Sequence, residues 1–298
     1  MSLAPIILFV YNRPEHTQKT VEALKLNNFA SESILFVFSD GNKNETDKKN
    51  IDEVRNYISS ISGFKEVNIV LREENLGLAE SVISGVTEII NKFGKAIVIE
   101  DDIVTSKYFL KFMNEALEFY KAQKNIYSIS GYNFPVKIPR SYKHKVYASP
   151  RPSSWGWATW KDRWENAIWN PENVMDIKNL NQLNILVDRV GKDIAPMLLK
   201  SIEGRTNSWA VKWVFTHIKY GGLTIFPVKS FVKNIGADAS GTNFIKSTKK
   251  YDVSLDNESQ QFEFVDNLEV NEELFSQIKK IVRPGLLSFI KYRLFKIY

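Results

Sequence analysis

Three adjacent carboxylates, Glu100, Asp101 and Asp102, directly follow an apolar run at residues 96–99. Such a run is typical of a strand buried on both faces, and α/β proteins bind ligands at the carboxyl ends of these strands. Neighbouring carboxylates repel one another, so a divalent metal ion or an Arg or Lys side chain is needed to keep them ionised. The triplet predicts a site for a metal-bound diphosphate. The alternative is that Asp101 and Asp102 cap a helix that begins at Ser106.

Polar loops follow other apolar runs in the same way, and their residues are candidates for binding a nucleotide. Asp40, beside Gly41 and Asn42, is suited to accept hydrogen bonds from a ribose hydroxyl or a base N–H, or is a simple turn residue. Arg13 is suited to face a phosphate, or is a surface arginine beside a helix start. The remaining nucleotide-binding candidates are Tyr11, Arg72 and Asn75.

The elements that position these loops can be predicted from hydrophobic periodicity. Apolar runs at residues 5–10, 33–38, 67–71 and 96–99 predict strands, and after each of the first three a polar loop leads into residues with helical spacing. Alternating strands and helices predict an α/β fold with a mostly parallel central sheet, flanked by helices and joined by right-handed crossovers. The loops should therefore converge on one edge of the sheet.

Composition narrows the classes of function. The chain has 298 residues, no cysteine and three histidines, which excludes disulfides and thiolate metal sites and disfavours a histidine-rich zinc site. A net charge of +6 suits anionic ligands or an anionic membrane surface, but it is too small to indicate a nucleic-acid partner. The absence of cysteine, of a basic segment before the first apolar run and of a membrane-length apolar stretch favours a cytoplasmic location.

Aromatic residues are concentrated in the second half of the chain. Five tryptophans lie within residues 155–169, and indole rings stack well on the C–H faces of sugars. The spacing of Trp157, Trp160 and Trp164 is also typical of a buried helix face. The candidates for binding a sugar are Ser154 and Trp155, on the loop before them, and Trp209, in a helix predicted to end near residues 221–222.

Together these segments resemble a known family. Residues 9–24 (FVYNRPEHTQKTVEAL), 36–42 (FVFSDGN), 74–86 (ENLGLAESVISGV) and 97–104 (IVIEDDIV) look like the nucleotide-binding half of family 2-like bacterial glycosyltransferases with the GT-A fold, in which EDD is a form of the DXD motif. Residues 149–160 (SPRPSSWGWATW) are similar to a segment of sugar transferases grouped as hemolytic-protein-like, and residues 234–243 (NIGADASGTN) resemble the family's NxGxDxSGT loop.

The resemblance implies an inverting hexosyltransferase in bacterial surface polysaccharide synthesis, with Mn²⁺ or Mg²⁺ as cofactor. It implies that a UDP-sugar is the donor, bound by the nucleotide-binding candidates above, and that a saccharide or lipid-linked saccharide is the acceptor, bound by Ser154, Trp155 and Trp209. It also implies that Asp40 contacts the nucleoside, that Glu100 and Asp101 orient the donor, and that Asp102 binds the metal.

Two positions depart from the related pattern. Asn207 stands where a carboxylate is common, so the general base must come from elsewhere, and Glu203 and Asp238 are the candidates. Asn243 stands where a histidine is common and is only a weak metal ligand. The alternatives are therefore a nucleotidyltransferase, although its Gly-rich phosphate loop is missing after the first strand, or a catalytically impaired nucleotide- or carbohydrate-binding protein.

The sequence predicts a transferase domain at residues 1–245, with a nucleotide-sugar half (1–130) and an acceptor half (131–245). Residues 246–298 are predicted to be a polar linker, suited to close over a bound donor, and a C-terminal helical tail. Residues 286–298 are apolar and basic, which fits an interfacial helix on the inner face of the membrane or a helix packed on its own domain.

Overall fold

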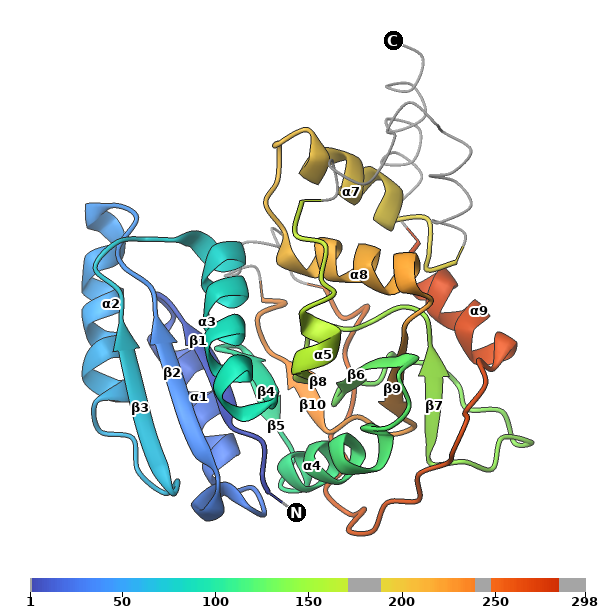
Figure 1. Cartoon of the computed structure of the whole chain (residues 1–298). Coiled ribbons are helices and arrows are strands. Elements are labelled where there is room, and N and C mark those ends of the chain that lie inside the picture. Colours follow the sequence, from blue (N-terminus) through green and yellow to red (C-terminus); the bar gives the residue numbers. More distant parts are fainter. Residues whose placement is uncertain (1, 171–188, 239–247, 284–298) are drawn as a thin grey trace.

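A computed structural model describes residues 2–170, 189–238 and 248–283. Its centre is an eight-stranded sheet in the order β3-β2-β1-β4-β8-β6-β9-β7, and a two-stranded sheet of β10 and β5 accompanies it (Figure 1). The strands are β1 Ile6–Val10, β2 Ile34–Ser39, β3 Glu66–Leu71, β4 Lys95–Glu100, β5 Ile103–Thr105, β6 Ile126–Ser130, β7 Val146–Ser149, β8 Trp157–Trp160, β9 Leu223–Pro227 and β10 Val232–Asn234.

Helices cover both faces of the large sheet. They are α1 Pro14–Lys25, η1 Ala30–Glu32, α2 Glu45–Ile58, α3 Gly77–Phe93, α4 Phe109–Tyr120, α5 Lys161–Trp164, α7 Ile194–Ile202, α8 Trp209–Tyr220 and α9 Glu272–Ile281. Local sequence sets their ends: Pro14 opens α1, and the side chains of Asn44 and Ser208 cap α2 and α8 by accepting backbone hydrogen bonds.

The predicted strands of the first half are confirmed, and their burial explains their composition. Ile6 and Leu8 of β1 face a core shared with α1, α2, α4 and α9, whereas Ile7 and Phe9 face a second core shared with α3, α5 and α8. Because successive side chains of a strand point to opposite faces, a strand covered on both faces must be apolar throughout.

The prediction of a mostly parallel sheet is wrong, because the sheet is mixed. Strands β3, β2, β1 and β4 are parallel neighbours, but β8 runs antiparallel to both β4 and β6, and β7 runs antiparallel to β9. No helix lies between β6 and β8 along the chain, and a strand reached without a crossover helix commonly pairs antiparallel. Since β6 and β9 are parallel to each other and β8 is antiparallel to both β6 and β4, the carboxyl ends of β4, β6 and β9 lie on the same edge.

The tryptophans do not form one helix face. Trp157 and Trp160 belong to strand β8, where a spacing of three places them on opposite faces of the sheet, and Trp164 ends the short helix α5. Trp157 stacks on Trp209 at 5.1 Å between ring centroids, and both rings are buried. This aromatic group is therefore part of the core between the sheet and α8.

Much of the C-terminal segment packs on the body of the protein. Leu274, Phe275 and Ile278 of α9 are buried in the larger core, and Leu255 forms an isolated bridge with Ser230. Residues 284–298, which include the predicted lipid-binding helix, lie outside the described residues. Among the residues that are described, no helix is both long and apolar enough to cross a bilayer. The division at residue 245 stays a prediction.

Candidate functional site at the carboxyl end of β4

The acidic triplet lies where β4 ends, and Arg13 at the start of α1 reaches across to it. The Arg13 guanidinium pairs with the Asp101 carboxylate through Nη2 and through Nε, which is 3.3 Å from Oδ2, and its Nη1 lies 3.1 Å from Asp102 Oδ2. The Asp101 backbone carbonyl accepts a hydrogen bond from the Thr20 hydroxyl. Strand β5 separates the triplet from α4, which begins at Phe109, so the aspartates do not cap that helix.

Burial dominates the electrostatics of the triplet. Loss of hydration, followed by the negative charges of Asp102 and Asp101, raises the pKa of Glu100 to about 8. Burial also raises the pKa of Asp101 to about 6, although the Arg13 charge opposes this. Burial disfavours the charged form of Arg13, but the two aspartates outweigh it and raise the Arg13 pKa. Arg13 is thus a permanent cation that only partly compensates three carboxylates.

We expect Glu100→Gln to stabilise the ligand-free protein at pH 8. The pKa of Glu100 is about 8 in the folded state against 4.5 in the unfolded state, so between these pH values the folded state binds more protons and stability falls as pH rises. At about 1.4 kcal/mol per pKa unit, the gain should be on the order of 4 kcal/mol at pH 8 and small at pH 4.5. Thermal unfolding from pH 4.5 to 8.5 measures it.

Glu88→Gln is the matched control, because Glu88 is an exposed residue of α3 whose pair with Lys92 contributes little. If Glu100→Gln raised the free energy of unfolding equally at pH 4.5 and pH 8, the ionised Glu100 carboxylate would not be the source of the added stability.

The segment after β10 closes the site from the other side. Ile235 donates its backbone N–H to the Asp102 carbonyl at 2.9 Å, and a Cβ on Gly236 would overlap Asp102 Oδ2 and lie 2.9 Å from Arg13 Nη1. Two residues further on, Asp238 Oδ2 lies 3.2 Å from His16 Nε2 of α1. The sequence had indicated Asp238 as a base candidate, but it gave no signal for His16 as its partner.

Asp40 lies at the carboxyl end of β2 and is bound to the start of α3. Its two carboxylate oxygens accept hydrogen bonds from the backbone N–H groups of Leu76 and Gly77, each at 3.0 Å. Asn75 donates to the Gly41 carbonyl at 2.8 Å, and Gly41 packs so closely on the backbone of Glu74 that a Cβ would collide with it. The loops after β2 and β3 therefore form one unit, and a nucleoside contact by Asp40 or Asn75 stays a prediction.

The two remaining donor candidates have protein partners. The Tyr11 hydroxyl donates to Asp47 Oδ2 at 2.9 Å, and Arg72 donates to the Ser81 hydroxyl at 2.7 Å. The guanidinium of Arg55 holds the loops after β2 and β3 together, because it donates hydrogen bonds to the backbone carbonyls of Asp40 and Arg72. Asp47 and Arg55 were missed, because an acid or a base within a helical repeat carries no sequence signal of its own.

The acceptor candidates occupy different surroundings. Trp155 is half-buried, with its ring edge-to-face against Tyr132 at 4.6 Å and Tyr251 at 5.8 Å, and Ser154 precedes it in the same loop. Trp209 is 3% exposed, so its indole packs in the core in this structure. Glu203 is exposed after α7 and pairs with Arg205. Asn243 lies outside the described residues.

The triplet fits a metal ion only together with a ligand that supplies further oxygens. Within the described residues, no group of three or more His, Cys, Asp or Glu side chains is arranged to hold a metal ion. Mg²⁺-type sites commonly use one or two carboxylates plus substrate phosphates, which Asp102 and a diphosphate can provide. The Arg13 guanidinium, which is paired with both aspartates, adds a fixed positive charge beside such an anionic ligand.

The fold and site define a mixed α/β protein with a charged, partly buried site at the carboxyl edge of its sheet. No protein-family model and no curated protein matches the chain. Among solved structures it is similar to TarS from S. aureus, with a TM-score of 0.41 and 10% identity over 78% of this chain and 37% of TarS. A TarS 1–349 structure gives a TM-score of 0.40 and 11% identity over 76% of this chain and 59% of that one.

A mannosyltransferase from Pyrobaculum calidifontis, solved in complex with GDP-Man and Mn²⁺, has a TM-score of 0.35 and 11% identity over 53% of this chain and 44% of its own. The chain thus spans less than two thirds of each of these three structures.

Proposed function

We propose that this chain is a glycosyltransferase that moves a sugar from a nucleotide diphosphate donor to a saccharide acceptor with the help of a divalent metal ion. The proposal is carried by the convergence of Arg13, Asp101, Asp102 and Gly236 at the carboxyl end of β4. These residues come from three of the sequence segments that resemble GT-A glycosyltransferases. An inverting mechanism, a UDP-sugar donor and a role in bacterial surface polysaccharide synthesis at the inner face of the membrane belong to the proposal and rest on that resemblance.

The charges of the site suit a departing diphosphate. Asp102 would hold Mn²⁺ or Mg²⁺ together with the diphosphate, and the metal supplies positive charge that stabilises the leaving group. Arg13 orients Asp101 and Asp102, and its positive charge would also attract a phosphate oxygen held at Asp102. Asp40 is suited to the nucleoside, because its buried carboxylate is held in a fixed orientation by two backbone N–H groups.

Asp238 is the better of the two base candidates. Its side chain is 48% exposed, it pairs with His16, and it lies two residues from Gly236, which contacts the triplet. An accessible carboxylate there can accept the proton of an attacking hydroxyl. Glu203 lies on the exposed surface after α7, and its carboxylate is paired with Arg205.

A thermal-shift panel of nucleotide sugars with and without Mn²⁺ tests the proposal. At a ligand concentration near 100 Kd we expect about 2.7 kcal/mol of stabilisation, seen only when donor and Mn²⁺ are both present. Asp102→Asn should remove this shift, whereas Asp52→Asn, on the exposed face of α2, should keep it. A donor-induced shift that survives in Asp102→Asn would contradict the metal assignment, and no shift with any donor would contradict the function.

The pairing of Arg13 with both aspartates favours a second candidate, a protein that binds nucleotides or saccharides without metal. A cation for the triplet is already present in the chain. In that case the nucleotide would stabilise the protein equally with and without Mn²⁺, and no sugar would be transferred to any acceptor.

A further inference from the structure

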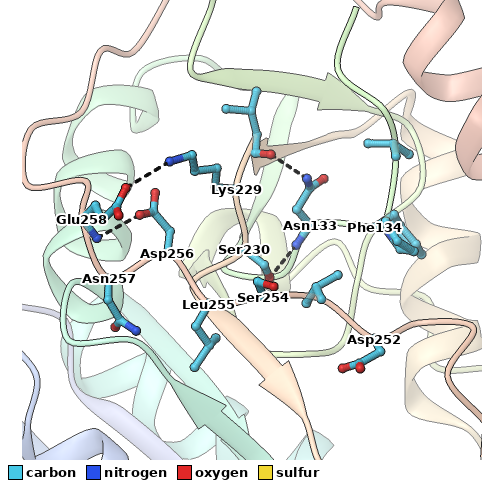
Figure 2. Close-up of a pocket in the computed structure, with 14 residues that line it drawn as sticks. Asn133, Phe134, Lys229, Ser230, Asp252, Ser254, Leu255, Asp256, Asn257 and Glu258 are labelled. Carbon is cyan, nitrogen blue, oxygen red and sulfur yellow. Dashed lines mark hydrogen bonds and ion pairs between the residues drawn. The ribbon is translucent and has the colours of Figure 1, made fainter.

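A pocket of about 670 Å³ lies in the second half of the chain, and none of its lining residues belongs to the acidic triplet. Three segments form its walls: residues 133–136 after β6, residues 228–230 between β9 and β10, and residues 252–258. Figure 2 shows Lys229, Asp256 and Glu258 gathered on one side and Asp252 on the other. The volume lies within the roughly 300–1,000 Å³ typical of small-molecule sites.

Hydrogen bonds hold the first two walls together. Asn133 donates its backbone N–H to the Ser230 hydroxyl at 3.0 Å and its side-chain amide to the Val228 carbonyl at 2.8 Å. Its side-chain oxygen accepts from the Tyr147 hydroxyl at 2.7 Å. Both polar groups of the Asn133 side chain thus bind protein atoms. Asn133 therefore sets the shape of the pocket, and other lining residues are expected to bind the ligand.

The third wall is fixed to the same frame. Asp256 donates its backbone N–H to the Ser230 carbonyl at 2.8 Å, and its carboxylate accepts from the backbone N–H groups of Glu258 and Ser259. Lys233 of β10 pairs with Asp252 at 2.8 Å. The pocket is therefore preformed, which lowers the entropic cost of binding.

The lining chemistry disfavours anions and suits hydroxyl groups. The lining includes three acids, Asp252, Asp256 and Glu258, but one base, Lys229, whose ammonium lies 3.7 Å from Glu258. A phosphate would meet like charges, whereas carboxylates and backbone groups accept hydrogen bonds from sugar hydroxyls. Apolar surface for the C–H faces of a sugar comes from Phe134, Pro135, Val136, Val228, Val253 and Leu255.

The fold connects this pocket to the acidic triplet. Because β4, β6 and β9 run in the same direction, the pocket segments that follow β6 and β9 lie on the same edge of the sheet as the triplet. Strand β10 starts just after Ser230 of the pocket and leads to Gly236, which packs on Asp102. Next to the lining residues Asn133 and Asp252, Tyr132 donates its hydroxyl to the Tyr251 carbonyl, and Trp155 packs on both rings.

We infer that this pocket binds an uncharged saccharide unit of the acceptor. The role as an acceptor site rests on the proposed glycosyl transfer, but the saccharide specificity follows from the pocket alone. A ligand seated there reaches toward the triplet along the edge of the sheet, past Trp155.

Saccharide binding can be tested with a variant that fills the pocket. Ser254 lies exposed on its wall, so Ser254→Trp places an indole in the space without disturbing the core, and Gln260→Trp adds the same group to an exposed position outside the lining. Maltotriose, cellotriose and chitotriose are the probes, glucose 6-phosphate is the anionic comparator, and saturation-transfer difference NMR measures binding. We expect a neutral trisaccharide to bind wild type and Gln260→Trp, and to bind Ser254→Trp at least tenfold more weakly.

The inference is overturned if none of the trisaccharides binds, if Ser254→Trp binds them as wild type does, or if glucose 6-phosphate binds as tightly as the best trisaccharide. Thermal shifts with nucleotide sugar and Mn²⁺ on the same three proteins separate the two proposals. If nucleotide sugar and Mn²⁺ raise the unfolding temperature of all three proteins but Ser254→Trp leaves the trisaccharide affinity unchanged, only the saccharide site in the pocket is contradicted. If Ser254→Trp weakens trisaccharide binding but nucleotide sugar and Mn²⁺ shift the unfolding temperature of none of the three proteins, the pocket is a saccharide site. The proposed transferase activity and the role of the pocket in holding an acceptor are then both contradicted.

Discussion

Replacing Arg13 by methionine is expected to lower the free energy of unfolding by about 3–5 kcal/mol at pH 7, the usual cost of leaving buried charges without their partner. Methionine keeps an unbranched side chain that fits the space, so the loss reports the charge. Because burial already holds the pKa of Asp101 at about 6 with Arg13 present, Asp101 of the variant should take up a proton readily, and the loss should shrink toward pH 5. Urea denaturation followed by tryptophan fluorescence measures both values.

Lys19→Met is the matched control for this variant. Lys19 lies on the same helix, its side chain is 62% exposed, and its pair with Glu15 is 4.0 Å long, so its removal should change stability by no more than about 0.5 kcal/mol. If Arg13→Met and Lys19→Met behave alike, Arg13 is not the counter-charge of the triplet.

Gly236→Ala is expected to weaken metal-dependent donor binding at least tenfold. The added methyl group would lie 2.2 Å from Asp102 Oδ2 and 2.9 Å from Arg13 Nη1, so the Asp102 carboxylate has to move. Overpacking of this kind costs roughly 1–3 kcal/mol of stability, and the carboxylate would no longer lie where a metal ion and a diphosphate can share it. Isothermal titration of a nucleotide sugar in the presence of Mn²⁺ measures the affinity.

Ala237→Ser provides the comparison, since it adds one atom at the next, half-buried position of the same loop. Its donor affinity should stay within twofold of wild type. Equal donor affinity in Gly236→Ala and wild type would mean that the Asp102 carboxylate has no part in binding.

The first half of the fold was predictable because burial on both faces leaves a clear mark on composition. The runs that became β1, β2 and β4 are apolar almost without interruption. Strand β6 escaped prediction because its sequence IYSIS is short and includes two serines. The reversed direction of β8 could not be predicted either, because direction depends on which strands are its neighbours and not on its own residues.

The chemistry of the site was more predictable than its contacts. Strand-end loops of parallel strands meet at one edge, so Asp40 and the triplet could be placed on the same edge from the sequence. The triplet also required a cation, but the sequence left a metal ion and a basic side chain open, and only the packing of α1 against the turn after β4 brings Arg13 to it. His16 carried no signal because it is one polar residue on a helix, and its partner Asp238 is far away in the sequence.

The reversed strand β8 has a consequence for the size of the acceptor. It lies between β4 and β6, so the ends of these two strands, which lead into the triplet and into residues 133–136 of the pocket, are two strand spacings apart, about 10 Å. In the proposed transfer, a molecule that fills the pocket and presents a hydroxyl group at the triplet must span a gap of this order, which is longer than a single sugar ring. The proposal therefore implies a minimum acceptor length, and we expect monosaccharides to be poor acceptors even when their ring fits the pocket.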